Sequence, residues 1–185
     1  RIRIARIATR TIVPVLLVAL ALGSATAQPL EPEAARALSL ARIANEQAIE
    51  ADAPAFPDQP LWAKAIRLAE AARDAAPDDP RTLGLLAEVY SRAGFYGPAW
   101  TAWTTYLDAG HGLAPEQTPL FLEVGEQLAW SAYERGDRQR AVELHLAVLD
   151  AVPFSKESRV WVARIRMEQG RPVDAIPYWE AVVAQ

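Results

Sequence analysis

The sequence predicts an all-α protein built as a stack of antiparallel helix hairpins. Four apolar segments carry an alanine at an equivalent place: Ala65, Ala99, Ala141 and Ala175, which are spaced by 34, 42 and 34 along the chain. Three of these alanines follow a glycine by five positions: Gly94, Gly136 and Gly170. Within the segments, apolar residues recur at three and four spacing, as on one face of a helix. Because one hairpin of this length cannot bury its apolar face alone, the units are expected to stack.

Length and composition agree with one domain. The chain has 185 residues, of which 51% are hydrophobic and 23% are charged, enough for a single core and too few for several. It contains no cysteine, which excludes disulfides, thiolate nucleophiles and sulfur ligands for metals.

The segment Arg1–Ala27 has the form of an export signal. Four arginines at its start precede the uncharged, apolar run Ile12–Leu22, and Ala25–Ala27 has the small-x-small form of a cleavage site. We expect cleavage after Ala27 and an exported protein, periplasmic or associated with the cell envelope. The alternative is a retained membrane anchor, because the uncharged run Thr11–Gln28 reaches the lower limit of the length that spans a bilayer.

The chain after the signal is acidic. Removing the four arginines of the signal leaves 15 basic against 23 acidic side chains, a net charge of −8. Nucleic acid and anionic membrane surfaces attract positive faces, so neither is expected as the main partner. A membrane is expected to be contacted only through the signal segment, if that segment is not cleaved.

The first hairpin is expected to be degenerate. Residues 28–33 form an extended leader, and residues 34–49 and 61–75 have the pattern of helices, giving a hairpin over 34–76. Between these helices, three prolines in the segment 52–60 prevent a continuous helix, and Pro60 stands where the other units have glycine.

Three regular units follow, at about 80–110, 119–153 and 156–185. Gly94 lies at the corner of the first of them, where chain reversal favours a positive φ. Eight extra residues within Ala109–Pro119 predict a surface loop or a short extra turn. Pro177 is expected to delay the start of the final helix.

The best unit resembles a known repeat family. It reads Leu83-x2-Leu86-Ala87-x2-Tyr90, then Gly94, then Ala99-x3-Trp103. This is similar to the consensus of the tetratricopeptide repeat (TPR), whose period is 34, with Leu in place of its Trp and Ala in place of its Gly. The resemblance covers about Leu61–Gln185 and implies a right-handed superhelical solenoid.

The search for catalytic motifs is negative. No metal, phosphate-loop, nucleophile-elbow or dinucleotide motif is present, so neither an enzyme nor a cofactor or metal is expected. His145 lies four positions after a repeat alanine, where the second unit has Trp103, which favours a core position over ligation or catalysis. His111 lies in the inserted loop, where it either contacts a partner or belongs to a solvated turn. Glu123 and Glu126 could act as a general acid and base. Their spacing of three positions on a helix favours the alternative, a solvated face.

The resemblance also implies a binding surface. In TPR arrays the first helices of successive hairpins line a concave groove that holds an extended peptide or a partner helix. By phase, the groove positions are Arg81, Gly84, Glu88, Ser91, Arg92, Glu123, Glu126, Trp130, Tyr133, Glu134, Glu157, Val160, Arg164, Met167 and Glu168. We select eight of them as partner-binding residues: Arg81, Arg92, Glu123, Glu126, Trp130, Tyr133, Arg164 and Met167.

Trp130 and Tyr133 are the expected anchors of a partner. The alternative is that both rings simply pack against the neighbouring hairpin. Chaperone-binding TPR proteins use a Lys and Asn clamp for carboxylates, and here Gly84 and Glu88 stand at those places, so that activity is not implied.

The sequence therefore predicts a non-catalytic scaffold or adaptor of the cell envelope that binds other proteins in its groove. The alternative is a structural subunit of an envelope assembly, held or self-associated through its C-terminal helix. That helix carries Trp179, Val182 and Val183 with no polar helix after it to cover them.

Overall fold

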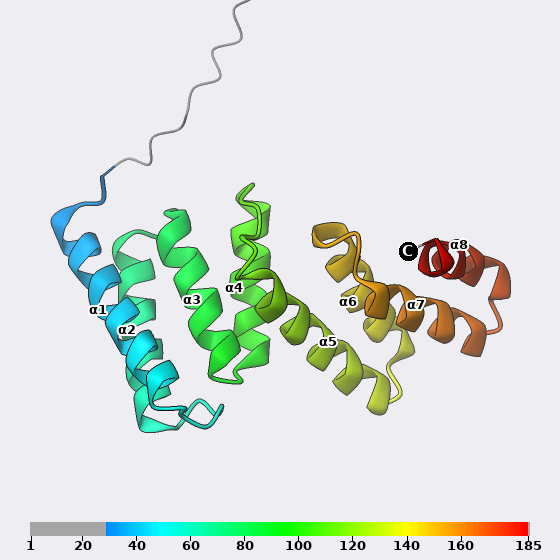
Figure 1. Ribbon diagram of the computed structural model, residues 1–185, viewed down its shortest axis with the longest axis horizontal. Coiled ribbons are helices and arrows are strands. Elements are labelled where there is room, and N and C mark those ends of the chain that lie inside the picture. The colour runs from blue at the N-terminus through cyan, green and yellow to red at the C-terminus, as the bar shows by residue number, and fades with distance from the viewer. Residues whose placement is uncertain (1–28, 185) are drawn as a thin grey trace, which may run out of the picture.

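A computed structural model describes residues 29–184 of the chain, and the predicted export signal lies outside these residues. The described part forms eight helices in four consecutive hairpins (Figure 1). Their bounds are α1 Pro32–Glu50, α2 Pro60–Ala75, α3 Pro80–Arg92, α4 Tyr96–Asp108, α5 Thr118–Glu134, α6 Arg138–Ala151, α7 Lys156–Glu168 and α8 Pro172–Val183.

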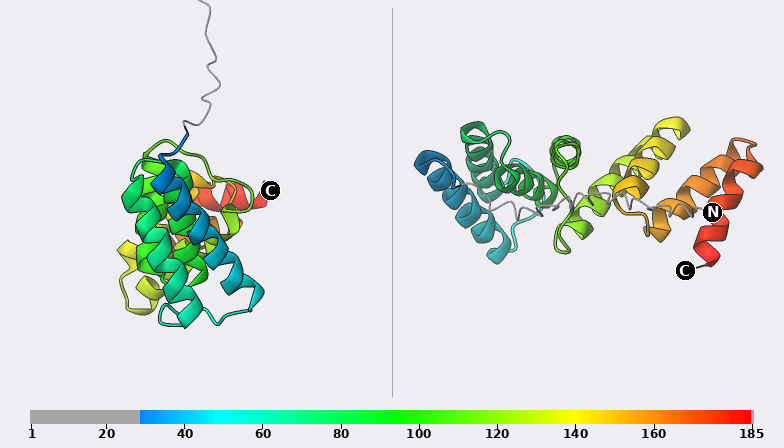
Figure 2. Two further views of the ribbon diagram at one scale, coloured as in Figure 1. Left: turned by 90° about the vertical axis from the view of Figure 1, so that its left-hand side faces the viewer. Right: turned by 90° about the horizontal axis from the view of Figure 1, so that it is seen from above.

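The hairpins stack in a row in chain order. Each helix packs most extensively on its hairpin partner, and each second helix then packs on the first helix of the next hairpin. Seen from above, the row is elongated and its helices alternate in direction (Figure 2). This arrangement confirms the prediction of an all-helical, TPR-like solenoid. Within residues 29–184, no helix combines the length and apolar character needed to cross a membrane.

The repeat alanines lie where the two helices of each hairpin meet. Ala65, Ala99, Ala141 and Ala175 are all completely buried. A methyl group at these places allows close approach of the two helices, and larger side chains then fill the space between one hairpin and the next. The equivalence found in the sequence is therefore an equivalence in packing.

Two predictions about helix ends are wrong. Helix α1 begins at Pro32, so residues 32 and 33 are helical and do not belong to an extended leader. Helix α8 begins at Pro172 and runs through Pro177, which does not delay it. Both helices start on a proline, whose fixed φ suits the first turn and whose missing N–H has no helical partner there. Arg171 and Asp174 close the first turn of α8 with an ion pair at 2.6 Å.

Buried side chains form two core clusters. The larger extends over α1 to α5 and reaches α6, and it contains the buried rings of Trp62, Trp103 and Phe121. The smaller joins α5, α6 and α7 and contains mainly alanine, valine, leucine and isoleucine side chains. The aromatic side chains of the C-terminal half are thus displaced from the core toward the surface, where the candidate site lies.

Candidate functional site

The first helices of the hairpins form one side of the solenoid, as the groove prediction requires. Helix α3 contacts both α1 and α5, and rings of α5 and α7 touch each other. Three hollows lie among these helices, with volumes of about 510, 260 and 390 Å3. The predicted groove residues are therefore divided among separate hollows.

The first hollow, between α1 and α3, is polar and partly covered by the chain itself. The loop before α5 folds back over α3, where the amide of Gln117 donates to Glu88 at 2.9 Å. Gly84 is buried beneath it, and a Cβ there would come within 3.2 Å of the same amide and 3.4 Å of Tyr106. Gly84 still lines the first hollow, and the inserted loop covers part of that hollow through the side chain of Gln117.

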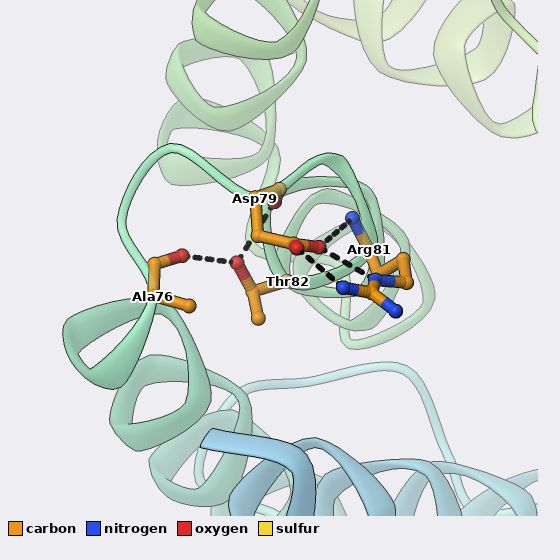
Figure 3. Close-up of polar contacts among 4 residues, drawn as sticks. All are labelled: Ala76, Asp79, Arg81 and Thr82. Carbon is orange, nitrogen blue, oxygen red and sulfur yellow. Dashed lines mark hydrogen bonds and ion pairs between the residues drawn. The ribbon is translucent and has the colours of Figure 1, made fainter. Parts of the chain in front are cut away.

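Arg81 borders this hollow but is engaged at the start of its own helix (Figure 3). Asp79 caps α3 by accepting from the Arg81 backbone N–H at 2.9 Å, and its carboxylate forms an ion pair with the guanidinium at 2.7 Å. The hydrogen bond from the Arg81 side chain is the largest cause that lowers the pKa of Asp79. Thr82 donates to Ala76 at 2.6 Å, which ties α3 to the end of α2.

The second hollow lies beside the α1–α2 connection and contains the predicted residues Arg92 and Glu123. Glu123 accepts from the hydroxyl of Tyr96 at 3.2 Å. Burial, aided by Glu123, raises the pKa of Tyr96. Ser91 was also predicted to face the groove, but it is buried and accepts the indole N–H of Trp103 at 2.9 Å. Ser91 nevertheless borders the second hollow, while its hydroxyl serves as the polar partner of an indole N–H inside the hairpin.

The third hollow lies between α5 and α7 and is the most aromatic of the three. Trp130, Tyr133, Trp161 and His145 line it together with the carboxylates of Glu126 and Glu157. The ring centroid of Trp161 is 5.4 Å from that of Trp130 and 5.2 Å from that of Tyr133, with both pairs close to edge-to-face. We call these three rings, Trp130, Tyr133 and Trp161, the aromatic cluster.

Arginine side chains lie on the outer faces of the aromatic cluster. The guanidinium of Arg138 lies 3.6 Å from the ring centroid of Tyr133, and that of Arg164 lies 4.6 Å from that of Trp161. Glu168 accepts from the Tyr133 hydroxyl at 2.7 Å and pairs with Arg138 at 3.1 Å. The hydrogen bond to Glu168 is the main cause that raises the pKa of Tyr133. These contacts hold the rings in fixed positions around the hollow.

His145 forms the inner wall of the third hollow. Its ring lies parallel to that of Trp161 with centroids 6.2 Å apart, and its Nδ1 is 3.2 Å from Ser158 Oγ. The side chain is buried, as the repeat position predicted, and burial lowers its pKa to about 4. His145 is therefore neutral at pH 7 and acts as a packing group.

Glu126 is half-buried in the same wall. Burial raises its pKa, and the negative charges of Glu157 and Glu123 raise it further. The indole N–H of Trp161 donates to Glu157 at 3.3 Å. The hollow thus combines aromatic faces with two carboxylates that repel each other.

The structure brings Glu126, Trp130, Tyr133 and Arg164 together at one place. Trp130 is 44% exposed and also packs on Trp161. Both alternatives for this ring therefore hold in part: one part of the side chain is exposed, and another part packs on the neighbouring hairpin. Of the other selected residues, Arg81, Arg92 and Glu123 line the other two hollows, and Met167 is 52% exposed and lines none of the three. The α5–α7 hollow thus gathers more of the selected residues than either of the other two hollows.

Sequence reasoning missed Trp161 and Arg138. Trp161 lies next to the selected groove phase, directly after Val160 and three positions before Arg164, and a tryptophan at that place was the available signal. Arg138 begins α6, and nothing in the repeat pattern indicates that it reaches back over Tyr133.

Other candidates have simpler surroundings. The ring of His111 lies 5.0 Å from Tyr106 at the edge of the inserted loop. Among residues 29–184, no group of three or more His, Asp or Glu side chains is arranged to hold a metal ion. Helix α8 exposes four large apolar side chains: Val173, Ile176, Trp179 and Val183.

The fold defines the class of protein as an all-helical, TPR-like solenoid. No protein-family model and no curated protein matches the chain. It is similar to a solved structure of MamA AMB-1, with 17% sequence identity and a TM-score of 0.44, covering 82% of this chain and 88% of that one. A structure of MamA MSR-1 gives 17% identity and a TM-score of 0.43, covering 81% and 92%.

Proposed function

We propose that this chain is a non-catalytic scaffold that binds a peptide or a partner helix on the α5–α7 side of the solenoid. The observation that carries the proposal is the aromatic cluster, which lines a hollow of about 390 Å3 with Trp130 nearly half exposed. Exposed, rigidly held aromatic side chains supply most of the binding energy in many protein interfaces. The form of the segment Arg1–Ala27 supports an export signal, and we propose the cell envelope as the place of action.

The aromatic cluster is suited to this function because its rings are already ordered. Tyr133 is fixed by Glu168 and Arg138, and Trp161 is fixed by Glu157 and by His145 behind it. A partner therefore meets a surface whose side chains lose little freedom on binding. The first hollow lacks this arrangement, since Gln117 already engages Glu88 and Asp79 already engages Arg81 there.

The test is capture of partners from the native cell by the tagged chain, with identification by mass spectrometry. Trp130→Ala combined with Tyr133→Ala is expected to abolish capture and to leave the helical content unchanged. Trp130 is 44% exposed, and Tyr133 packs against the smaller core without being one of its buried residues. Phe154→Ala is the matched control: it removes a ring that is 79% exposed in the α6–α7 connection and is expected to leave capture intact. Capture at wild-type level by the double variant contradicts the proposal.

A second candidate function is that of a structural subunit. The observation that favours it is the apolar face of α8, where Val173 is 75% exposed and Ile176 is 50% exposed. Exposed apolar faces of this kind mark contact surfaces. Light scattering of the purified chain separates the two: an adaptor is expected to be monomeric, whereas a subunit held through α8 is expected to self-associate or to be isolated only with its assembly.

A further inference from the structure

We propose that the hollow beside the aromatic cluster binds a cationic side chain, arginine or lysine, of the partner peptide. This rests on the proposed function, because it names the chemistry that the same surface recognises. The elements of the site are the rings of Trp130, Tyr133 and Trp161 and the carboxylates of Glu126 and Glu157.

The lining of the hollow is complementary to a positive charge. Among the described residues, two carboxylates and four rings, including His145, line the hollow. None of these lining residues is Lys or Arg. Aromatic faces carry negative potential and attract ammonium and guanidinium groups, most strongly where water is excluded. Carboxylates beside such rings add a charge-assisted hydrogen bond to the same group. A cation is the one ligand that satisfies both kinds of group at once.

The chain itself shows that these rings accept guanidinium groups. Arg138 covers Tyr133 and Arg164 covers Trp161. Neither arginine is among the residues that line the hollow. Glu126, which does line it, forms no ion pair or hydrogen bond within residues 29–184. Two rings of the cluster thus have a cation over them, and the carboxylates that line the hollow have none.

The carboxylates are held in a state that a cation would relieve. Glu126 and Glu157 lie on different helices, α5 and α7, and repel each other across the hollow. Glu157 is oriented by the indole N–H of Trp161 and so faces the same space. A guanidinium or ammonium group between them would replace this repulsion by two attractions. The half-buried position of Glu126 reduces screening by salt at that carboxylate, whereas Glu157 is exposed.

His145 lines the hollow from the repeat position that Trp103 takes in the second hairpin, and an imidazole is a smaller ring than an indole. The volume of about 390 Å3 falls within the range of sites that bind small ligands. The hollow is therefore a recess that takes one side chain of an extended partner.

The experiment is titration of the 15N-labelled full chain with capped pentapeptides of the form Gly-Gly-X-Gly-Gly, where X is Arg, Lys or Gln. The indole N–H signals of Trp130 and Trp161 report on the hollow, and those of Trp62 and Trp103, both buried, are internal controls. The Arg and Lys peptides are expected to shift the first pair saturably and to leave the second pair unmoved. Equal shifts with the Gln peptide overturn the inference.

The matched variants separate charge from shape. Glu126→Gln with Glu157→Gln keeps the size of both side chains and is expected to weaken binding of the Arg peptide by about tenfold or more. Glu180→Gln, on the exposed part of α8, removes the same charge elsewhere and is expected to leave binding unchanged. Undiminished binding of the Arg peptide by the double variant overturns the inference. Choline is titrated as a cation without a peptide; saturable binding of choline with no response to either basic peptide also overturns it.

The failure of this inference is distinguishable from failure of the scaffold function. If Trp130→Ala with Tyr133→Ala abolishes partner capture while the Arg and Gln peptides bind alike, the surface binds proteins without a preference for cations. If that variant captures partners normally, the site itself is misplaced whatever the peptides do.

Discussion

Trp103 and His145 occupy the same place in the second and third hairpins, four positions after the repeat alanine, and have different consequences. The ring of Trp103 is completely buried, packs edge-to-face on Tyr106 and Phe121, and donates its N–H to Ser91. The smaller ring of His145 stacks on Trp161, with the hollow beside it. The position that is fully core in the second hairpin therefore lies beside a hollow in the third.

The same contrast extends over the two halves of the solenoid. In the N-terminal half, the indole N–H groups of Trp62 and Trp103 are satisfied inside the protein, by Ala53 and Ser91. In the C-terminal half, Trp130 and Trp161 lie at the surface, and the Trp161 N–H reaches Glu157 on the groove side. The rings of Trp62 and Trp103 thus belong to the larger core of the first half, and the candidate site lies on the second half.

Truncation of the buried ring is expected to have the largest effect. Trp103→Ala removes the central ring of the larger core and leaves a cavity, and such truncations of buried aromatic side chains cost about 3 to 5 kcal/mol. The free energy of unfolding, measured by urea denaturation followed by circular dichroism, checks this. Trp130→Ala is the matched control with a ring on the surface and should cost much less. Equal losses in the two variants would remove the distinction between the halves.

The next effect concerns acid stability and His145. Its pKa is about 4 in the fold and 6.5 in the unfolded chain, so between these values the unfolded state binds the proton first. Stability is therefore lost as the pH falls from 6.5 to 4, by about 3 kcal/mol in total from this group, and does not change further below pH 4. Thermal unfolding at pH 7 and pH 4.5 measures the loss.

His145→Phe isolates this contribution from those of the carboxyl groups. It keeps a ring at the inner wall but removes the titrating nitrogen, so the difference in stability between pH 7 and pH 4.5 should become smaller than in the parent chain. An unchanged difference would mean that His145 is accessible to protons in the folded state. In that case its position would not be the counterpart of Trp103 in packing.

The sequence was sufficient for the fold because the repeat signals are local and coincide. Three signals define the position of each hairpin: an alanine where the helices cross, a glycine at the corner and the spacing of apolar residues. Because they agree, they predicted where Ala99 and Gly94 lie. The errors occurred where tertiary contacts decide. Gly84 has the phase of a groove position and lines the first hollow, but the length of an insertion does not tell that its Gln117 will fold back over that hollow.

The candidate site was predictable only in part. Phase placed Trp130 and Tyr133 on the first-helix side, because that needs only helical periodicity. Their neighbours depend on how far α7 is displaced and rotated relative to α5, which no pattern within one helix specifies. Trp161 and Arg138 were missed for that reason, and they complete the surroundings of the hollow.

The corner glycines test the contrast on the smallest scale. Gly94 and Gly136 both have positive φ, 70° and 83°, where an L side chain is strained by about 1 to 2 kcal/mol. At Gly94 an added Cβ would also lie 2.7 Å from the backbone carbonyl oxygen of Ala55, whereas at Gly136 nothing lies within 4 Å. Gly94→Ala should therefore destabilise the chain by roughly 1 to 3 kcal/mol more than Gly136→Ala, because a backbone atom cannot move aside as a flexible side chain does. Chemical denaturation of the two variants compares them directly. Equal losses would show that the connection 51–59 moves away from the added methyl group at little cost. The corner at Gly94 in the N-terminal half would then be no more tightly packed than the corner at Gly136 in the half that carries the site.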